Sequence, residues 1–75
     1  MANEGGVAAV DRALTILDAF REGDQSLTLT EISKRVGFYK STTLRLAESL
    51  EKFGYLRRLE DGAFRLGPKP LFLGS

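Results

Sequence analysis

Three features of the 75-residue chain predict a mainly α-helical fold with one small β-hairpin. A short helix pattern follows a capping box and stops at Gly37. A longer helix pattern begins directly after this glycine turn, and an Asp-Gly turn then joins two strand-like runs. With a further helix pattern over residues 7–20, this order predicts a winged helix-turn-helix made of three helices and a wing.

The helix expected over residues 7–20 has apolar residues at three- and four-residue steps, which places them on one stripe. They are Val10, Ala13, Leu14, Leu17 and Phe20. Ile16 stands roughly a quarter turn away from this stripe and widens the apolar face. Ile16 either completes the local core, which is the interpretation we favour, or serves a second partner such as another subunit. The polar residues 23–26 then end the helix.

The second helix is expected to begin at a capping box formed by Thr28 and Glu31. In such a box the threonine oxygen accepts from a first-turn amide, and the glutamate accepts from the amide of the cap. The helix should end at Gly37, because glycine adopts the left-handed conformation without steric cost. Its apolar face consists of Leu29, Ile32 and Val36. Leu27, just before the cap, is expected to form a very short strand against the wing.

The third helix should begin near Tyr39 or Lys40 and end at Gly54. Its apolar stripe is expected to be Thr43, Leu46, Ala47, Leu50 and Phe53. The opposite face holds Lys40, Ser41, Leu44, Arg45 and Glu48, flanked by Thr42. Hydroxyls and cations at the start of a helix can bind phosphates and base edges, and arginine can form a two-point bond to guanine. The exposed amides of the helix start favour a phosphate as well.

A polar helix face of this kind is usually only solvated surface. Its position after a capping box, a short turn and a defined core stripe favours contact with a DNA groove. Leu44 has two open interpretations, since it could touch a thymine methyl group or pack against its helix neighbours. The candidate DNA-binding residues are therefore Lys40, Ser41, Thr42, Leu44 and Arg45, together with Thr30 and Arg58.

The hairpin is predicted from Asp61-Gly62, which separates the runs 55–59 and 63–66. Phe64 and Leu66 should share the strand face that covers the core, with Arg65 pointing away. The faces of Arg57 and Arg58 are not assigned by the alternation, but one of the two is expected to contact a phosphate. The tip is acidic because Glu60 precedes Asp61, which argues against its deep insertion into DNA.

Charge is distributed unevenly along the chain, although the net charge is only +1. Residues 1–33 carry two cations against six acids, and residues 34–75 carry nine cations against four acids. The basic half contains the third helix and the hairpin, where phosphates would lie. Ordinary uneven charge in a small domain is the alternative explanation, so the asymmetry supports nucleic-acid binding without deciding it.

Cysteine and histidine are both absent from the sequence. Their absence removes the usual zinc ligands, disulfides and nucleophile–base pairs, so we expect no enzyme activity, no metal and no cofactor. No apolar run approaches the roughly 20 residues that span a bilayer, and no signal peptide precedes the domain. These features predict a cytoplasmic protein without a membrane partner.

Three segments are expected along the chain. Residues 1–6 form a flexible N-terminal segment, and residues 7–66 form the winged helix-turn-helix domain. Residues 67–75 form a linker and the start of a helix toward an effector-binding domain outside this chain. Alternatively, the apolar run at 71–73 packs back on the domain.

Several of these motifs together resemble the amino-terminal domain of IclR-type bacterial transcription regulators. They are Ala13-Leu14-x-Ile16-Leu17, 27–32, Gly37, Lys40-Ser41-Thr42-x-x-Arg45-Leu46, Leu50, Gly54-Tyr55-Leu56 and Phe64-Arg65-Leu66-Gly67. The resemblance covers about residues 7–73. It implies a helix-turn-helix at about 29–48, with Lys40, Ser41, Thr42 and Arg45 in the contact positions.

The resemblance also implies a larger carboxy-terminal effector domain, palindromic operators in double-stranded DNA, and homodimers or higher assemblies formed through the first helix and that domain. Two departures concern the pose of the third helix. Tyr39 stands where proline is common, and Thr43 and Ala47 stand where larger aliphatic residues are common.

The sequence thus favours sequence-specific DNA binding, as the reading head of an effector-responsive transcription regulator. The alternative is a winged-helix module for protein–protein interaction or dimerisation without DNA readout, because a fold does not fix a function. An enzyme is the least favoured of the three hypotheses.

Overall fold

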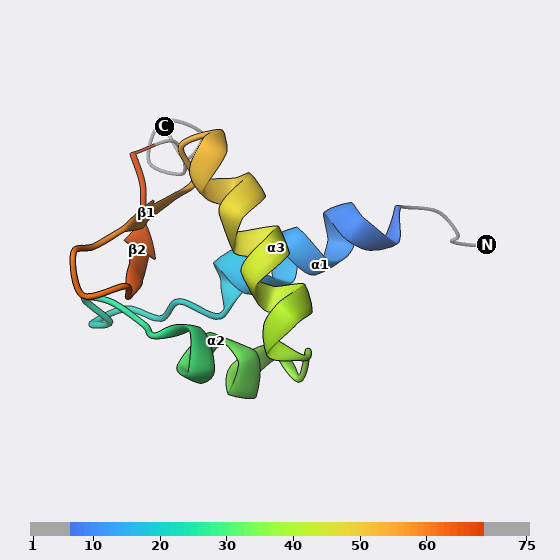
Figure 1. Ribbon diagram of the computed structural model, residues 1–75, viewed down its shortest axis with the longest axis horizontal. Coiled ribbons are helices and arrows are strands. Elements are labelled where there is room, and N and C mark those ends of the chain that lie inside the picture. Colours follow the sequence, from blue (N-terminus) through green and yellow to red (C-terminus); the bar gives the residue numbers. More distant parts are fainter. Residues whose placement is uncertain (1–6, 69–75) are drawn as a thin grey trace.

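The computed structural model describes residues 7–68, in which three helices precede a two-stranded antiparallel hairpin (Figure 1). The elements are α1 (Ala8–Asp18), α2 (Leu29–Val36), α3 (Lys40–Lys52), β1 (Leu56–Arg58) and β2 (Phe64–Leu66). This order confirms the predicted winged helix-turn-helix. The expected flexible segment 1–6 and residues 69–75 of the expected linker lie outside the described residues. None of the helices described is long and apolar enough to cross a membrane.

The side of α1 that faces the core differs from the predicted stripe. Ile16 is fully buried, and Ala13, Leu17 and Phe20 are partly buried against the same cluster. Val10 and Leu14 are each 53% exposed, so their assignment to the core was wrong. The helix carries apolar residues on two sides, and the Ile16 side is the one that packs in the domain. In Figure 1 the N-terminal half of α1 projects beyond the body of the domain.

The capping box of α2 is present as predicted. The Glu31 amide donates to Thr28 Oγ1 at 3.1 Å, and the Thr28 amide donates to Glu31 Oε1 at 2.8 Å. Gly37 ends the helix with a left-handed φ of 79°. Ser33 Oγ then donates to the carbonyl of Phe38, which holds the turn between α2 and α3. Local hydrogen bonds therefore fix both ends of α2 and the turn that follows it.

α3 buries one side against the other helices through Thr43, Ala47 and Leu50. The buried Thr43 hydroxyl donates to the carbonyl of Tyr39 at 2.9 Å, so this polar group is satisfied. Phe53 is 63% exposed, so its place in the predicted core stripe was wrong. The reason is that α3 ends at Lys52 and Phe53 is only the C-cap residue, before Gly54 turns the chain with φ of 89°.

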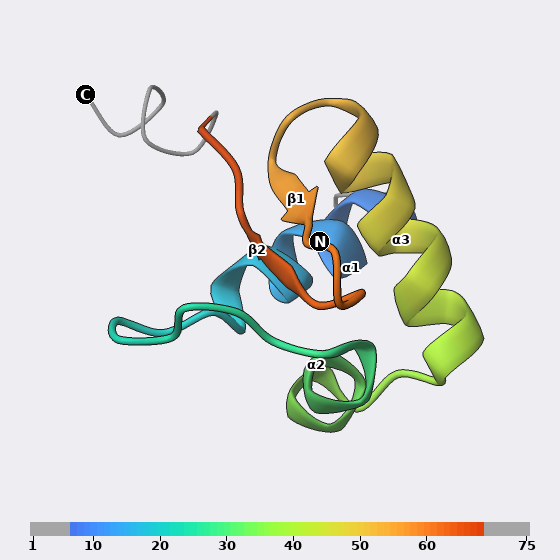
Figure 2. The same cartoon turned by 60° about the vertical axis from the view of Figure 1, so that its left-hand side comes forward.

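The hairpin lies on the side of the domain opposite to the free end of α1 (Figure 1), and in the turned view it comes in front of α1 (Figure 2). Leu56 pairs with Leu66, Arg57 with Arg65, and Arg58 with Phe64. Leu27 forms the expected short bridge to Phe64, with both hydrogen bonds at 2.8 Å. Phe64 and Leu56 are buried, whereas Leu66 is 43% exposed, so Leu66 does not cover the core as predicted.

Candidate nucleic-acid interface

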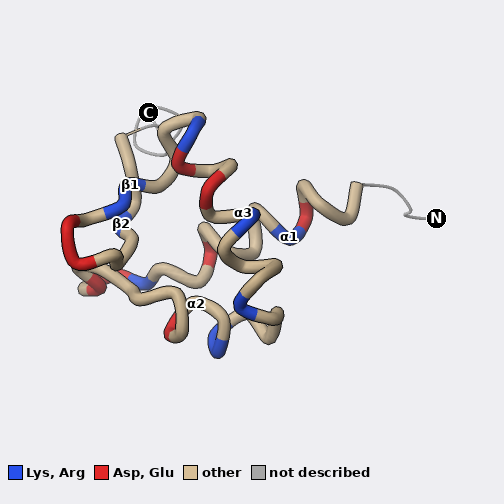
Figure 3. Tube along the Cα trace, viewed as in Figure 1, with Lys and Arg blue, Asp and Glu red and all other residues tan. Residues whose placement is uncertain are grey.

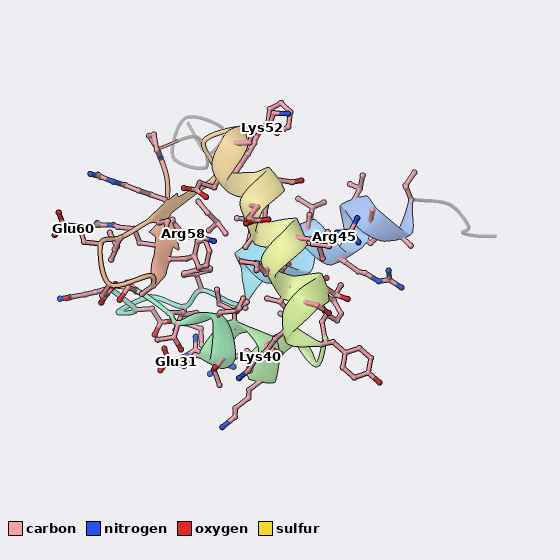
Figure 4. All side chains as sticks on the ribbon, viewed as in Figure 1. Glu31, Lys40, Arg45, Lys52, Arg58 and Glu60 are labelled. Atoms are coloured by element: carbon pink, nitrogen blue, oxygen red, sulfur yellow. The ribbon has the colours of Figure 1, made fainter. Side chains whose placement is uncertain are left out.

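The polar side of α3 is accessible from solvent. Lys40, Ser41 and Arg45 are exposed, and Thr42 is partly buried at the edge of the same face. Figure 4 places Lys40 at the start of α3 and Arg45 further along the same helix. Leu44 is partly buried and packs against the core cluster, so the structure favours the packing interpretation of this residue. α3 therefore has one side buried in the core and another open to solvent, as is required of a helix that enters a DNA groove.

Charge divides α3 along its length (Figure 3). Two of its three cations, Lys40 and Arg45, belong to the first half, whereas both of its acids, Glu48 and Glu51, belong to the second half together with Lys52. The first turn of the helix also holds no acidic residue. The amides of residues 40–42 precede the first intrahelical donor, Thr43, and point out of the helix start. The first half of α3 is therefore the part suited to an anionic strand.

Arg12 is a cation that sequence reasoning missed. Two open hollows lie between α1 and α3, and both are bordered by Arg12 and Thr42. The first is completed by Gly37, Phe38 and Tyr39, and the second by Ala9, Arg45, Leu46 and Ser49. Arg12 belongs to the acidic half of the sequence, so counting charges along the chain does not indicate it as part of a basic surface. Only the packing of α1 against α3 brings this guanidinium beside the polar face.

The register of the hairpin assigns the arginine faces that alternation left open. Arg57 and Arg65 are paired on one face of the hairpin, and Arg58 shares the other face with Phe64. The guanidinium of Arg58 lies 4.8 Å from the centre of the Phe64 ring, and Nη2 is 3.9 Å from Glu48 Oε2. Arg58 thus has partners inside the domain, whereas Arg57 and Arg65 place two like charges side by side on the exposed face.

An ion pair holds the loop after α1 against α2. Arg35 Nη1 is 2.7 Å from Asp24 Oδ2 and also donates to the carbonyl of Ala19 at 2.8 Å. The hydrogen bond from Arg35 lowers the pKa of Asp24, and the backbone amide of Arg21 adds to this effect. Arg35 is therefore a structural cation. Thr30, the candidate on α2, is partly buried in the first turn of that helix.

Among residues 7–68, no three carboxylates gather into a group that could hold a metal ion. The polar residues that the structure does bring together are the exposed first half of α3 and Arg12 beside it. They are cations, hydroxyls and amides, which suit an extended polyanion.

The chain also matches the model of a known protein family. The IclR helix-turn-helix domain is matched over residues 9–60, which include α2, α3, β1 and all of α1 but its first residue. The chain belongs to the IclR helix-turn-helix family. Membership in this family agrees with the resemblance that the sequence motifs indicate.

Individual relatives agree with this assignment. The HTH-type transcriptional regulator XynR of Escherichia coli is 44% identical over 64 residues, which are 84% of this chain and 25% of that protein. The fold of an IclR family transcriptional regulator from Brucella abortus matches with a TM-score of 0.86 and 33% identity, over 95% of this chain and 28% of that one.

A third relative was solved with a small molecule. It is an IclR homologue from Microbacterium hydrocarbonoxydans complexed with 4-hydroxybenzoate, with a TM-score of 0.81 and 28% identity. The match covers 89% of this chain and 29% of that one. The chain therefore spans about a quarter of the length of the relatives it matches.

Proposed function

We propose that this IclR-type domain binds double-stranded DNA sequence-specifically, with α3 in the major groove. The observation that carries the proposal is the division of α3 into two sides. Thr43, Ala47 and Leu50 are buried, whereas the first-half polar residues Lys40, Ser41 and Arg45 remain exposed. A helix placed in this way can enter a groove without unfolding any part of the core.

Roles follow from the chemistry of each side chain. Arg45 is exposed within the helix and makes a two-point bond to a guanine edge. Lys40, Ser41 and the first-turn amides bind phosphates, which fix the orientation of the helix on the duplex. Thr42 lines both hollows and contacts the DNA strand at the edge of the major groove. Leu44, at the core edge of the face, supports the helix by packing against the core cluster and is assigned no base contact.

Further phosphate contacts come from outside α3. Arg12 lines the same hollows as Thr42, and Thr30 lies in the first turn of α2. On the hairpin, Arg57 and Arg65 face outward, and they add to the contact first expected of Arg58. Each cation that meets a phosphate releases counterions, so together they should make binding strongly dependent on salt.

Dimerisation of the domain is proposed to use α1. Val7, Val10 and Leu14 follow one another at three- and four-residue steps and are all exposed. Burying this strip against its symmetry mate would pair two domains by a two-fold axis and would match a palindromic operator. A larger carboxy-terminal domain, as the length of the relatives suggests, would add to the pairing and bind a small effector.

The test is selection of bound sequences from a random duplex pool, followed by binding at several salt concentrations. The proposal predicts an inverted repeat and an affinity that falls steeply as salt rises. A protein-binding module would give no enriched sequence and little dependence on salt. Either of those two results would remove the case for a DNA reader.

A further inference from the structure

Tyr39 is the most exposed of the large apolar and aromatic side chains in residues 7–68, at 85%. It stands directly before Lys40, at the start of the helix that is proposed to enter the groove. An aromatic ring left in water forgoes the favourable free energy that burial would provide. Packing within the domain therefore does not account for an aromatic ring at this position.

The backbone of Tyr39 has a structural task that does not involve its ring. Its carbonyl accepts hydrogen bonds from the amide and the hydroxyl of Thr43, both at 2.9 Å. Its φ of −62° is the angle that a proline ring imposes, and no hydrogen bond within residues 7–68 uses its amide. The side chain does not cap the helix either. The task at this position could thus be met by residues that have no ring.

The surroundings of the ring suit a strand of the DNA backbone. Tyr39 is one wall of the hollow that Arg12 and Thr42 also line. Lys40 is the next residue and is exposed, so the ring has one cation beside it in the chain and another, Arg12, on the hollow that it lines. A guanidinium, an ammonium and a hydroxyl are the groups that bind phosphate oxygens, and the ring offers a flat apolar face to a sugar.

We propose that Tyr39 contacts the sugar–phosphate backbone of bound DNA at the start of α3. The ring packs on a deoxyribose, and the hydroxyl donates to a phosphate oxygen above the hollow that contains Arg12. This inference rests on the proposed function. It assigns to Tyr39 a share of the affinity for any duplex and no part in the choice of bases.

Two variants separate the ring from the fold. Tyr39→Pro keeps the observed φ, and Tyr39→Ser supplies the side-chain oxygen that the N-cap lacks. Both should unfold at or above the wild-type temperature, since neither disturbs the carbonyl that Thr43 uses. Tyr39→Phe keeps the ring and removes only the hydroxyl, so it serves as the conservative control.

Binding is measured by fluorescence anisotropy on a duplex selected by the wild-type chain and on a scrambled duplex, at several salt concentrations. The proline and serine variants should lose roughly three- to tenfold in affinity on both duplexes, with phenylalanine in between. The slope of affinity against salt should stay unchanged, because tyrosine carries no charge.

Equal affinity of wild type and the two ring-free variants would overturn the assignment. So would a loss confined to the selected duplex, since that result would make Tyr39 a reader of bases. If the wild-type chain bound neither duplex, the proposed function and this inference would fail together. Wild-type binding with unaffected variants would reject the inference alone.

Discussion

Arg58 of the hairpin and Glu48 of α3 approach within 3.9 Å, and this contact ties the wing to the second half of the helix that is proposed to read DNA. The same guanidinium lies over the buried Phe64 ring. It neutralises a carboxylate that would otherwise stand near the phosphates of a bound duplex. Arg57 and Arg65, on the outer face of the hairpin, make no such contact with a carboxylate or a buried ring among the described residues.

The hairpin arginines should therefore differ in their effects. Arg57→Ala is expected to leave stability nearly unchanged, to weaken binding to all duplexes similarly and to reduce the salt slope by about 0.9, the value for one lost phosphate contact. Arg58→Ala should also weaken all sequences and, in addition, lower the free energy of unfolding by about 0.5–1 kcal/mol through its contact with Phe64. Anisotropy and urea unfolding measure the two effects. An unchanged salt slope for Arg57→Ala would show that the outer face meets no phosphate.

The clamp between Arg35 and Asp24 should make stability depend on pH in the acid range. The pKa of the Asp24 carboxyl lies below the ordinary value of 3.8, chiefly because Arg35 donates a hydrogen bond to this group. A carboxylate with a lowered folded-state pKa contributes stability above its unfolded pKa and loses that contribution as pH falls through the folded value. Asp24→Asn should unfold at a lower temperature than wild type at neutral pH, and the difference should shrink below about pH 4. A difference that stays constant down to strong acid would show that the clamp does not titrate.

Leu50 and Phe53 provide a matched test of the core, because both belong to the predicted stripe of α3. Leu50 is buried and Phe53 is mainly exposed. Leu50→Ala should lower the free energy of unfolding by roughly 2–5 kcal/mol, enough to unfold much of so small a domain. Phe53→Ala should cost less than about 1 kcal/mol, as expected for a surface position. Thermal and urea unfolding measure both free energies. Similar losses of stability in the two variants would contradict the observed end of α3.

The contrast between these two residues shows what the sequence could specify. Two boundaries of α2 and the position of the hairpin followed from short-range chemistry, namely the box of Thr28 and Glu31, the left-handed Gly37 and the Asp61-Gly62 turn. The bridge of Leu27 to the wing was also predictable from its place before the cap. Except for the bridge, these features depend on hydrogen bonds and backbone angles that are set within a few residues of each other.

Features that depend on packing were less predictable. Periodicity placed Leu14 on the apolar stripe of α1 and favoured Ile16 as an addition to the core, but it could not show that Ile16 is buried while Leu14 is half exposed. Strands of three residues gave too little alternation to place Arg58 on the Phe64 face. Arg12 joins the edge of the candidate interface only because α1 crosses α3, which no local pattern encodes.

The exposed strip on α1 predicts how two domains associate. Leu14→Ser should reduce pairing of domains on an inverted repeat, since it places a hydroxyl in the apolar strip formed with Val7 and Val10. Stability should change little because Leu14 is already half exposed. Sedimentation of the DNA complex measures the number of bound copies. Unreduced two-fold occupancy would show that α1 is not the pairing surface.

Arg45 provides the most direct test of the claim that the exposed side of α3 reads a duplex. Affinities of wild type and Arg45→Ala are compared on the selected operator and on duplexes that differ from it by one base pair. The substitution should cost about 1–3 kcal/mol of binding free energy on the operator and relax the preference at one base pair. Unchanged affinity, with the same preference at every base pair, would contradict the assigned facing of α3.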